Sequence, residues 1–572
     1  MARHILIIGG TGVFGKRLVS HLAGFDGIKL FVSSRSAAKA QEFVDTLAGT
    51  HAPLQAVALD CIENLEAQLD EIQPFIVVDC SGPFQGANYD TARTVLGSGA
   101  HLIDLADARD YLADFATALE GITNLNQVAA LTGASSTPTL STCVATHLTN
   151  GWQRVDTVDI CITPGGKSEV GRSVVEAIMS YAGRDIPVWS FGRLSHITGW
   201  SNPRKVNLPG LGRRRVAVVE TFDAEYLGLH LNVQSRVSFS AGLESKIEQW
   251  GMEGIAVLRK YGIIKSPQKL VPLLLKARQF TRIFTSDAGG MLVDICGIDA
   301  EGVPTQARWS LLAKQDHGPF IPILPAAAAV EKLLGTGVAV GAGMAHSSLV
   351  LADILKQMEP YDIVTQTSLD QIPCSIFEKA LGKYSFDTLP AALQNFHKAS
   401  GPVVWSGVAD IESGGSILSK ALGVLFGFPK AGKDIPLTVN IDRTTTSDGT
   451  TVERWTRMFA GNKMWSILKY DCAGNLNETF LPFTFTLPLA ADQDGISMPV
   501  SGWRIGKLVL PKSLAPRSET REYMDEQGRF WFDVKLSAPM IGLIAHYKGW
   551  LEPNIGSQSP RQVRAYNEQL FR

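Results

Sequence analysis

The sequence of 572 residues predicts three parts of different fold class. They are an α/β domain with a doubly wound parallel sheet, an α+β domain with a mixed sheet, and a mostly antiparallel β domain. Three observations carry this prediction. Strand and helix patterns alternate in residues 1–150, more strands than helices follow in 151–370, and short alternating runs fill 374–572. We place the domain boundaries at these changes of pattern.

The first strand and the turn after it indicate the function of the first part. Ile5 to Ile8 form a short apolar run typical of a buried parallel strand. A G-x-G-x-x-G pattern with one additional glycine follows, and a helical pattern comes next. This order of elements predicts a Rossmann domain in which the turn binds a dinucleotide; the alternative is a purely structural glycine turn. The candidate cofactor-binding residues are Gly9, Gly10, Thr11, Gly12, Val13, Phe14 and Gly15.

The end of the second strand indicates which coenzyme is bound. Enzymes that use NAD commonly have an acidic residue here, which binds the ribose 2′-hydroxyl. This chain has Ser34, Arg35 and Ser36 instead, with Lys39 shortly after. A guanidinium beside hydroxyls suits a 2′-phosphate, so we expect NADP(H) to be preferred, with NAD(H) as the alternative.

Residues after the fourth and fifth strands are candidates for the nicotinamide end of the site. The turn Ser81, Gly82, Pro83 and Phe84 follows the fourth strand and is expected to line the nicotinamide ribose; a simple tight turn is the alternative. After the fifth strand come Asp104, Asp107 and Tyr111, which could transfer a proton. Asp107 is the preferred proton donor, although a helix N-cap is an equally good interpretation of it.

Three of these segments together resemble the saccharopine dehydrogenase-like family. They are Gly9–Gly15, the turn Cys80–Phe84 and the strand Gly99–Asp107, and the resemblance extends roughly from Met1 to Thr367. It implies an amino-terminal Rossmann domain that binds a pyridine nucleotide and a second α+β domain that holds the substrate. It also implies that the segment before Cys143 borders the nicotinamide. Cys143 is therefore a third catalytic candidate beside Asp107 and Tyr111, with a buried, inert cysteine as the alternative.

The middle part contains a basic segment with an apolar face, from Leu270 to Arg282. We favour a helix that faces the core, while lining an apolar pocket or lying at a membrane surface are the alternatives. Helices near residues 326–358 are expected to pack back on the nucleotide-binding domain, as the resemblance implies.

The last part, residues 374–572, resembles an uncharacterised domain that is fused behind saccharopine dehydrogenase-like regions. Its short runs of alternating residues, with Gly and Pro between them, predict antiparallel strands. Its many aromatic residues, including Trp405, Trp455 and Trp503, suit an ordinary core, and an interior that holds an apolar ligand is the alternative.

Composition excludes several classes of function. The formal net charge of −2 gives no general attraction to nucleic acid. Seven scattered cysteines argue against a disulfide framework and a metal site, and they fit a cytoplasmic protein. The first strand begins almost at Met1, so we expect no signal peptide, and no apolar run predicts a transmembrane segment.

Together these features predict an NADP(H)-dependent oxidoreductase that reduces an imine or carbonyl of a small metabolite. The alternatives are an enoyl reductase with a lipid-like, apolar substrate and a non-catalytic NADP(H)-binding sensor or assembly protein. We expect the chain to form a homodimer.

Overall fold

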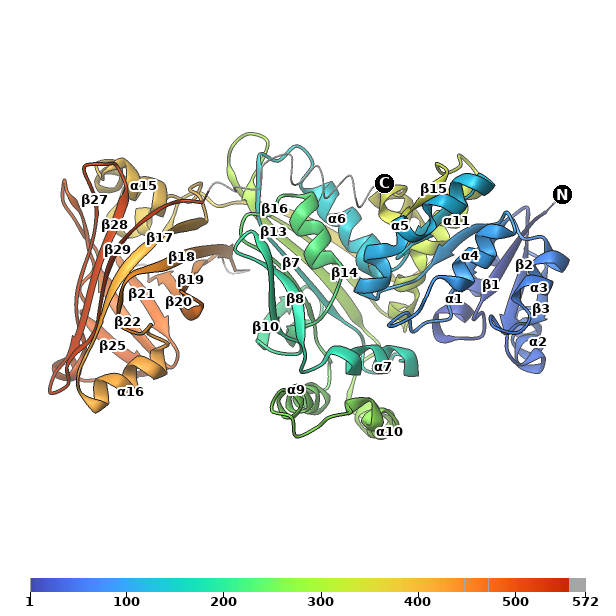
Figure 1. Cartoon of the computed structure of the whole chain (residues 1–572), viewed down its shortest axis with the longest axis horizontal. Coiled ribbons are helices and arrows are strands. Elements are labelled where there is room, and N and C mark those ends of the chain that lie inside the picture. The colour runs from blue at the N-terminus through green and yellow to red at the C-terminus, as the bar shows by residue number, and fades with distance from the viewer. Residues whose placement is uncertain (1, 447–448, 472, 555–572) are drawn as a thin grey trace.

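The computed structural model describes residues 2–446, 449–471 and 473–554. Three sheets follow one another along the long axis of the molecule, with the N-terminal part at one end and the C-terminal part at the other (Figure 1). They contain seven, nine and thirteen strands, so the predicted division into α/β, mixed and antiparallel parts is confirmed.

The first sheet is a Rossmann sheet of seven parallel strands in the order β15-β6-β5-β4-β1-β2-β3. The direction of strand progression reverses between β1 and β4, which is where such folds open a crevice at the carboxyl ends of the strands. The strands are β1 (Arg3–Ile8), β2 (Ile28–Ser34), β3 (Leu54–Ala58), β4 (Ile76–Asp79), β5 (His101–Asp104), β6 (Ala129–Thr132) and β15 (Gly341–Met344). The helices of this part are α1 (Val13–Leu22), α2 (Ala37–Thr46), α3 (Leu65–Ile72), α4 (Asp90–Gly97), α5 (Arg109–Asn126), α6 (Ser141–Leu148), α11 (Leu324–Leu334) and α12 (Leu351–Met358).

Strand β15 returns from far along the chain and extends the first sheet beyond β6, with Gly341 opposite Ala129. The sequence indicates helical structure from Gly341 to Met358, but Gly341–Met344 is a strand, Ala345–Ser347 a single 3₁₀ turn and only Leu351–Met358 an α-helix. Four residues of which two are glycines show no alternation of apolar and polar side chains, so the strand had no detectable signal.

The second sheet is mixed: β12 runs parallel to β7, and all other neighbouring strands of the sheet are antiparallel. Its main path is β10-β11-β12-β7-β13-β14-β16, and β8 and β9 branch from β12. The strands are β7 (Arg154–Thr163), β8 (Asp185–Ser190), β9 (Arg193–Thr198), β10 (Arg204–Leu208), β11 (Gly212–Val218), β12 (Arg236–Ala241), β13 (Gly289–Ile298), β14 (Pro304–Ala313) and β16 (Ile363–Gln371). The helices are α7 (Arg172–Tyr181), α8 (Asp223–His230), α9 (Lys246–Lys260) and α10 (Val271–Thr281).

The third sheet is antiparallel and curves around its own hydrophobic core (Figure 1). Four helices accompany it: α13 (Ile376–Leu381), α14 (Lys383–Asp387), α15 (Ala391–His397) and α16 (Ile417–Phe426). Its strands are β17 (Val404–Ser413), β18 (Gly432–Thr445), β19 (Thr451–Phe459), β20 (Asn462–Tyr470), β21 (Asn475–Phe480), β22 (Phe483–Pro488), β23 (Ala490–Ala491), β24 (Gly495–Ser497), β25 (Gly502–Ile505), β26 (Leu508–Val509), β27 (Arg517–Met524), β28 (Phe530–Ala538) and β29 (Gly542–Pro553).

One hydrophobic core extends through the first two parts, and a second core belongs to the third part. Polar contacts join the second and third sheets. Ser235 Oγ donates to Asn440 Oδ1 at 2.7 Å, and the Arg236 guanidinium lies 3.6 Å from the Asp442 carboxylate. The third part therefore contacts the mixed sheet, at the opposite end of the molecule from the Rossmann sheet (Figure 1).

Helix α10 turns one face to the core, as expected for Leu270–Arg282, because Val271 is buried and Leu274 and Leu275 pack against the core of the first two parts. Its other face carries Leu273 and Phe280, which are exposed over 63% and 74% of their surface. The apolar spacing did not indicate this second, uncovered apolar face. None of the described helices is long and apolar enough to cross a membrane.

Candidate functional site

The glycine-rich turn between β1 and α1 is compact because three of its glycines leave no room for a side chain. Gly9 adopts φ +69°, and the Gly12 N–H donates to its carbonyl at 2.9 Å. A Cβ on Gly15 would overlap the Gly9 carbonyl oxygen, and one on Gly10 would lie 2.8 Å from Val32 Cγ1. The backbone of the turn therefore lies directly against the start of α1, where free N–H groups favour an anion.

A cavity of about 980 Å³ opens at this turn. It lies at the carboxyl ends of β1, β2 and β4, which is the position expected for a ligand of a doubly wound sheet. Nine of the predicted cofactor-binding residues line it: Gly9, Thr11, Gly12, Val13, Phe14, Ser34, Arg35, Ser81 and Gly82. The other four, Gly10, Gly15, Pro83 and Phe84, do not line it.

Positive charge gathers at the end of the cavity formed by β2 and α2. Ser34, Arg35, Ser36 and Lys39 all line the cavity there. Ser36 begins α2, and its hydroxyl accepts the Lys39 backbone N–H at 3.4 Å. Two cations and two hydroxyls within six consecutive residues suit the geometry of a bound phosphate.

The wall opposite the glycine-rich turn comes from the second part of the chain. Gly171, Ser173 and Val174, at the start of α7, line the same cavity, and a Cβ on Gly171 would lie 3.3 Å from Val13 Cγ2. The sequence pattern did not indicate that these residues belong to the nucleotide cavity, because they come after β7 of the mixed sheet and match no nucleotide-binding motif. The cavity is thus closed by both of the first two parts.

Two buried carboxylates hold the loops beside the cavity. Asp79 accepts the Ser81 N–H at 2.8 Å, and Asp104 Oδ1 accepts from the Gly133 N–H at 2.9 Å and the Thr132 hydroxyl at 2.7 Å. Burial raises the pKa of Asp104 to about 7 and also raises the pKa of Asp79. Both groups act as positioning residues for the loops that follow β4, β5 and β6.

Asp107 lies three residues after Asp104 and contacts the loop that follows β4. Gln85 Nε2 donates to Asp107 Oδ1 at 3.2 Å. The Asp107 side chain reaches solvent but is closely surrounded by protein, and the resulting desolvation raises the pKa of its carboxyl. Tyr181, at the end of α7, and Glu220, after β11, stand near it. Burial and then the Asp107 charge raise the pKa of Tyr181, while burial, the Asp110 charge and to a smaller extent the Asp107 charge raise the pKa of Glu220. Sequence reasoning missed these two residues, since nothing in the order of elements connects them to Asp107.

None of the three catalytic candidates, Asp107, Tyr111 and Cys143, is among the residues that line the cavity. Tyr111 belongs to an aromatic cluster, with its ring centroid 5.2 Å from that of Phe84 and 4.8 Å from that of Tyr89. Cys143 is buried on α6, and its thiol donates to the Leu349 carbonyl at 3.5 Å. Burial raises the pKa of Cys143 to about 12, so this thiol is protonated at neutral pH. Catalytic roles for both residues stay predictions.

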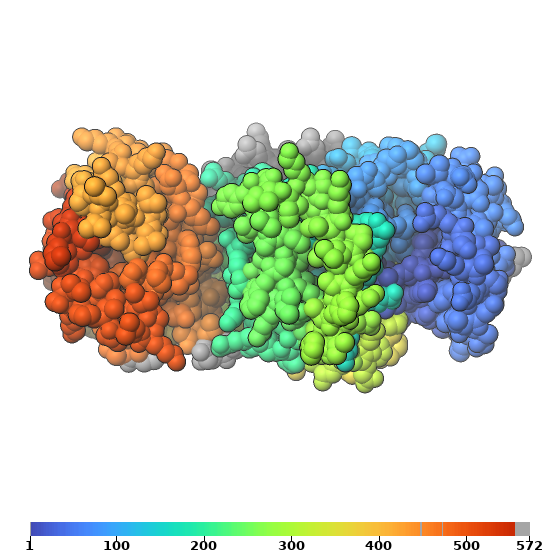
Figure 2. Space-filling model, turned by 90° about the horizontal axis from the view of Figure 1, so that it is seen from below, coloured from blue at the N-terminus to red at the C-terminus, as the bar shows by residue number. Residues whose placement is uncertain are grey.

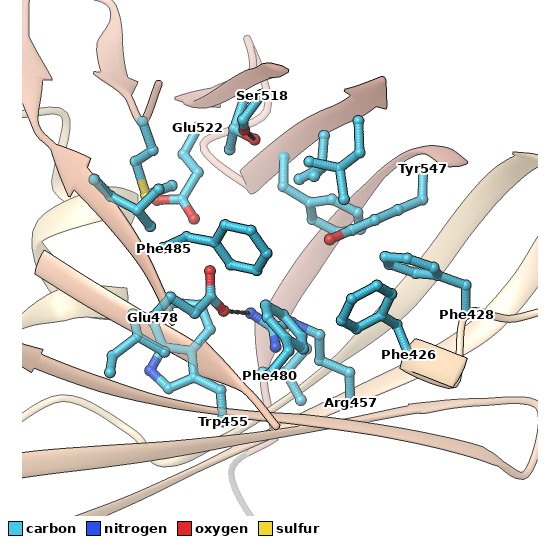
Figure 3. Close-up of a pocket in the computed structure, with 18 of the residues that line it drawn as sticks. Phe426, Phe428, Trp455, Arg457, Glu478, Phe480, Phe485, Ser518, Glu522 and Tyr547 are labelled. Carbon is cyan, nitrogen blue, oxygen red and sulfur yellow. Dashed lines mark hydrogen bonds and ion pairs between the residues drawn. The ribbon is translucent and has the colours of Figure 1, made fainter. Parts of the chain in front are cut away.

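The third part contains a second cavity, of about 140 Å³, inside its curved sheet (Figure 3). Aromatic and aliphatic side chains form most of its wall, among them Phe426 and Phe428 at the end of α16 (Figure 3). Arg457 lies 3.4 Å from Glu478 and donates to Ser466 Oγ at 3.0 Å. An apolar cavity with a few placed polar groups is typical of sites for small apolar ligands.

The described residues offer no cluster of three His, Cys, Asp or Glu side chains placed to bind a metal ion. The cysteines within the described ranges are all free, and Cys472 lies outside the described residues. The three consecutive arginines of β11 are partly engaged by protein carboxylates, because Arg214 pairs with Glu244 at 3.2 Å and Arg215 with Glu253 at 2.7 Å.

Comparison with solved structures finds similar chains among dehydrogenases. A histidine-tagged apo saccharopine dehydrogenase (L-Glu forming) from Saccharomyces cerevisiae is 12% identical, with 64% of this chain and all of that chain covered and a TM-score of 0.48. An amine dehydrogenase from Mycobacterium smegmatis is 10% identical over 61% of this chain and 97% of its own, with a TM-score of 0.37. An engineered D-amino acid dehydrogenase bound to NADP+ is 13% identical over 63% of this chain and all of its own, with a TM-score of 0.35.

Comparison of sequences gives one match. No curated protein matches the chain significantly. Residues 389–551, which contain most of the third sheet, match the family model described as a domain of unknown function, DUF4166. The expectation of an uncharacterised domain fused behind a Rossmann region and a mixed sheet is thereby confirmed.

Proposed function

We propose that this protein is an NADP(H)-dependent oxidoreductase that reduces an imine or carbonyl group of a small metabolite. The observation that carries the proposal is the 980 Å³ cavity. The glycine-rich turn, the N-terminus of α1 and the group of Ser34, Arg35, Ser36 and Lys39 all line it. A pyrophosphate fits the first two features and a 2′-phosphate fits the third. Consumption of NADPH in the presence of candidate imines and carbonyl compounds tests the proposal, and a bound but unconsumed coenzyme would favour the sensor alternative.

The coenzyme, when bound, would supply the hydride, and the chain would supply position and a proton. Asp107 is the proposed proton donor. Desolvation by the surrounding protein raises the pKa of its carboxyl, so it holds a proton more readily than an ordinary aspartate. The hydrogen bond from Gln85 orients this carboxyl. Asp79 and Asp104 keep the loops on either side in place, and the start of α7 forms one wall of the cavity.

Replacing Arg35 by alanine is expected to weaken NADPH binding by about 10- to 100-fold, which corresponds to about 1.4–2.7 kcal/mol. NADH binding should change by less than about twofold, because NADH has no 2′-phosphate. Titration of coenzyme fluorescence or calorimetry measures both affinities. Arg93→Ala on α4, which does not line the cavity, is the matched control. Equal losses for the two coenzymes would contradict the assignment of Arg35.

Replacing Asp107 by asparagine is expected to lower kcat about 100-fold, with the dissociation constant of NADPH unchanged. Asparagine keeps the shape of the side chain and the contact with Gln85 but cannot donate a carboxyl proton. Steady-state kinetics with any substrate that the wild-type protein reduces gives kcat. A parallel Asp110→Asn variant, at an exposed neighbouring position, should retain the wild-type rate. A variant of Asp107 with normal kcat would place the proton donor elsewhere.

A second candidate function is an enoyl reductase whose substrate is lipid-like and apolar. The cavity of the third part supports it, because its aromatic and aliphatic lining suits an apolar group. Native mass spectrometry of the protein as extracted from cells tests this candidate. Retained lipid would favour it over reduction of a small polar metabolite.

A further inference from the structure

The segment from Lys246 to Phe284 lies beside the mixed sheet, with one face packed on the core and many large apolar side chains exposed on its outer face. It contains α9, α10 and a final 3₁₀ turn (Arg282–Phe284), and we call it the helical arm. Trp250 is exposed over 58% of its surface and Phe284 over 90%. The exposed large apolar residues of the arm are Ile247, Trp250, Val257, Leu258, Tyr261, Ile263, Leu273, Phe280, Ile283 and Phe284. Such a concentration marks an interaction surface rather than scattered surface residues.

The helical arm is also strongly basic, although the whole chain has a formal net charge of −2. It contains eight Lys and Arg residues against two Glu. Both glutamates are paired with arginines: Glu248 with Arg278 at 2.9 Å, and Glu253 with Arg215 at 2.7 Å. Cationic side chains next to exposed aromatic and aliphatic side chains are typical of helices that lie in the interface of an anionic membrane.

Helix α16 of the third part has the same character. Ile417 and Val424 are exposed over 87% and 84% of their surface, while Ser419 is buried. Phe426 turns inward to the cavity, but Ile417, Leu418, Val424 and Leu425 all face solvent, so most of the large apolar side chains of the helix do not stabilise a core. Its only charged residue is Lys420.

The strand turns around α16 carry further exposed apolar residues. Ser416 Oγ, at the start of α16, donates to Ile541 O at 3.4 Å, and the Phe426 ring lies 5.7 Å from that of Phe483. The turns between β21 and β22, β25 and β26, and β28 and β29 therefore lie at the same end of the sheet. We call this set the apolar rim: Ile417, Leu418, Val424, Leu425, Leu481, Ile505, Leu508, Val509, Leu514 and Met540. Lysines adjoin it, namely Lys420, Lys430, Lys433, Lys507 and Lys512.

The helical arm and the apolar rim lie on one side of the molecule. In Figure 1, α9, α10 and α16 all lie along the lower edge, and Figure 2, seen from below, faces this side with the green arm in front. We propose that this side is a membrane-docking surface whose partner is the surface of an anionic lipid bilayer. The apolar side chains would enter the headgroup region and the lysines and arginines would contact lipid phosphates.

Docking would bring both cavities of the protein to the membrane. Phe426 and Phe428 at the end of α16 line the cavity of the third part, and α10 packs against α7, whose first turn lines the nucleotide cavity. Docking itself does not depend on the chemistry at the nucleotide site. The added consequence that the reduced substrate is apolar and drawn from the bilayer rests on the proposed function.

Sedimentation of the full chain with phosphatidylcholine vesicles, with and without about 30% phosphatidylserine, tests the docking proposal. We expect binding to the anionic vesicles, at least about tenfold weaker binding to neutral ones, and weakening at 0.5 M NaCl because the charge attraction is screened. A Phe280→Asp/Ile283→Asp variant in the arm and a Leu418→Asp/Leu425→Asp variant in the rim should each bind at least about tenfold more weakly.

Controls separate docking from other causes. Leu125→Asp changes an equally exposed leucine on α5, outside both patches, and should bind like the wild type. Circular dichroism and NADPH affinity should be unchanged in all variants, so a failure of the proposed reaction would not affect this result. Absence of vesicle binding, or equal binding by wild type and both patch variants, would overturn the proposal. So would a concentration-dependent dimer that the patch variants abolish without any vesicle binding.

Discussion

Replacing Gly15 by valine is expected to abolish saturable binding of NADPH up to about 1 mM. A Cβ at this position would overlap the carbonyl oxygen of Gly9 and would lie 2.8 Å from Gly10 Cα. Both obstacles are backbone atoms of the turn itself, so neither can rotate away, and overpacking of this kind forces the backbone to move. If the wild-type protein binds NADPH with micromolar affinity, the loss is about 1,000-fold or more, or about 4 kcal/mol.

Calorimetric titration with NADPH measures this effect. Gly24→Ala, at the end of the same helix, is the matched control, because a Cβ there would lie 3.5 Å from the His21 carbonyl, an ordinary contact. Thermal unfolding of both variants shows whether the Rossmann sheet remains folded. A folded Gly15→Val protein with wild-type affinity would mean that the turn does not hold the phosphates, and the oxidoreductase proposal would then lose its main support.

The predictable half of the candidate site is the half that is local in sequence. Gly9 to Gly15 and Ser34 to Lys39 are contiguous segments, and each follows a buried strand whose apolar run is clear. Strand order in a doubly wound sheet then places both segments at one edge. The other half could not be predicted, because Gly171 and Ser173 reach the cavity from the second part, through tertiary contacts that a linear pattern does not contain.

The outward-facing helices show a different limit of sequence reasoning. Periodicity detects the apolar stripe of α10 correctly, but the same stripe suits a core, a pocket or a membrane. The core-facing interpretation describes one face of α10, where Leu274 and Leu275 pack against the core, but the pattern did not show that Leu273 and Phe280 are uncovered. The strands of the third sheet are easier to predict, because antiparallel strands alternate visibly between buried and exposed positions. The alternating residues from Thr451 to Phe459 predict a strand with these bounds, and β19 spans the same residues.

Replacing Glu453 by alanine is expected to destabilise the third part by about 3–5 kcal/mol, because it breaks a buried ion pair and leaves a charge without a partner. Glu453 and Arg443, on adjacent strands, are almost fully buried, with Arg443 Nε 3.2 Å from Glu453 Oε1. Trp455 Nε1 also donates to Glu453 Oε2, at 2.9 Å. Alanine would remove the acceptor of the indole N–H and the carboxylate paired with the guanidinium, which would keep the Gly401 and Phe396 carbonyls as acceptors.

Hydrogen exchange of peptides from β18 and β19 measures the free energy of opening locally, which avoids treating a chain with two separate cores as a two-state system. Glu519→Ala is the matched control: Glu519 pairs with Lys535 at 2.8 Å across adjacent strands, but that pair is exposed and its loss should change exchange very little. Similar protection in the two variants would show that the Arg443–Glu453 pair does not stabilise the sheet. A large loss confined to Glu453→Ala would show that the wall of the apolar cavity depends on a satisfied buried charge, because Trp455 lines that cavity directly.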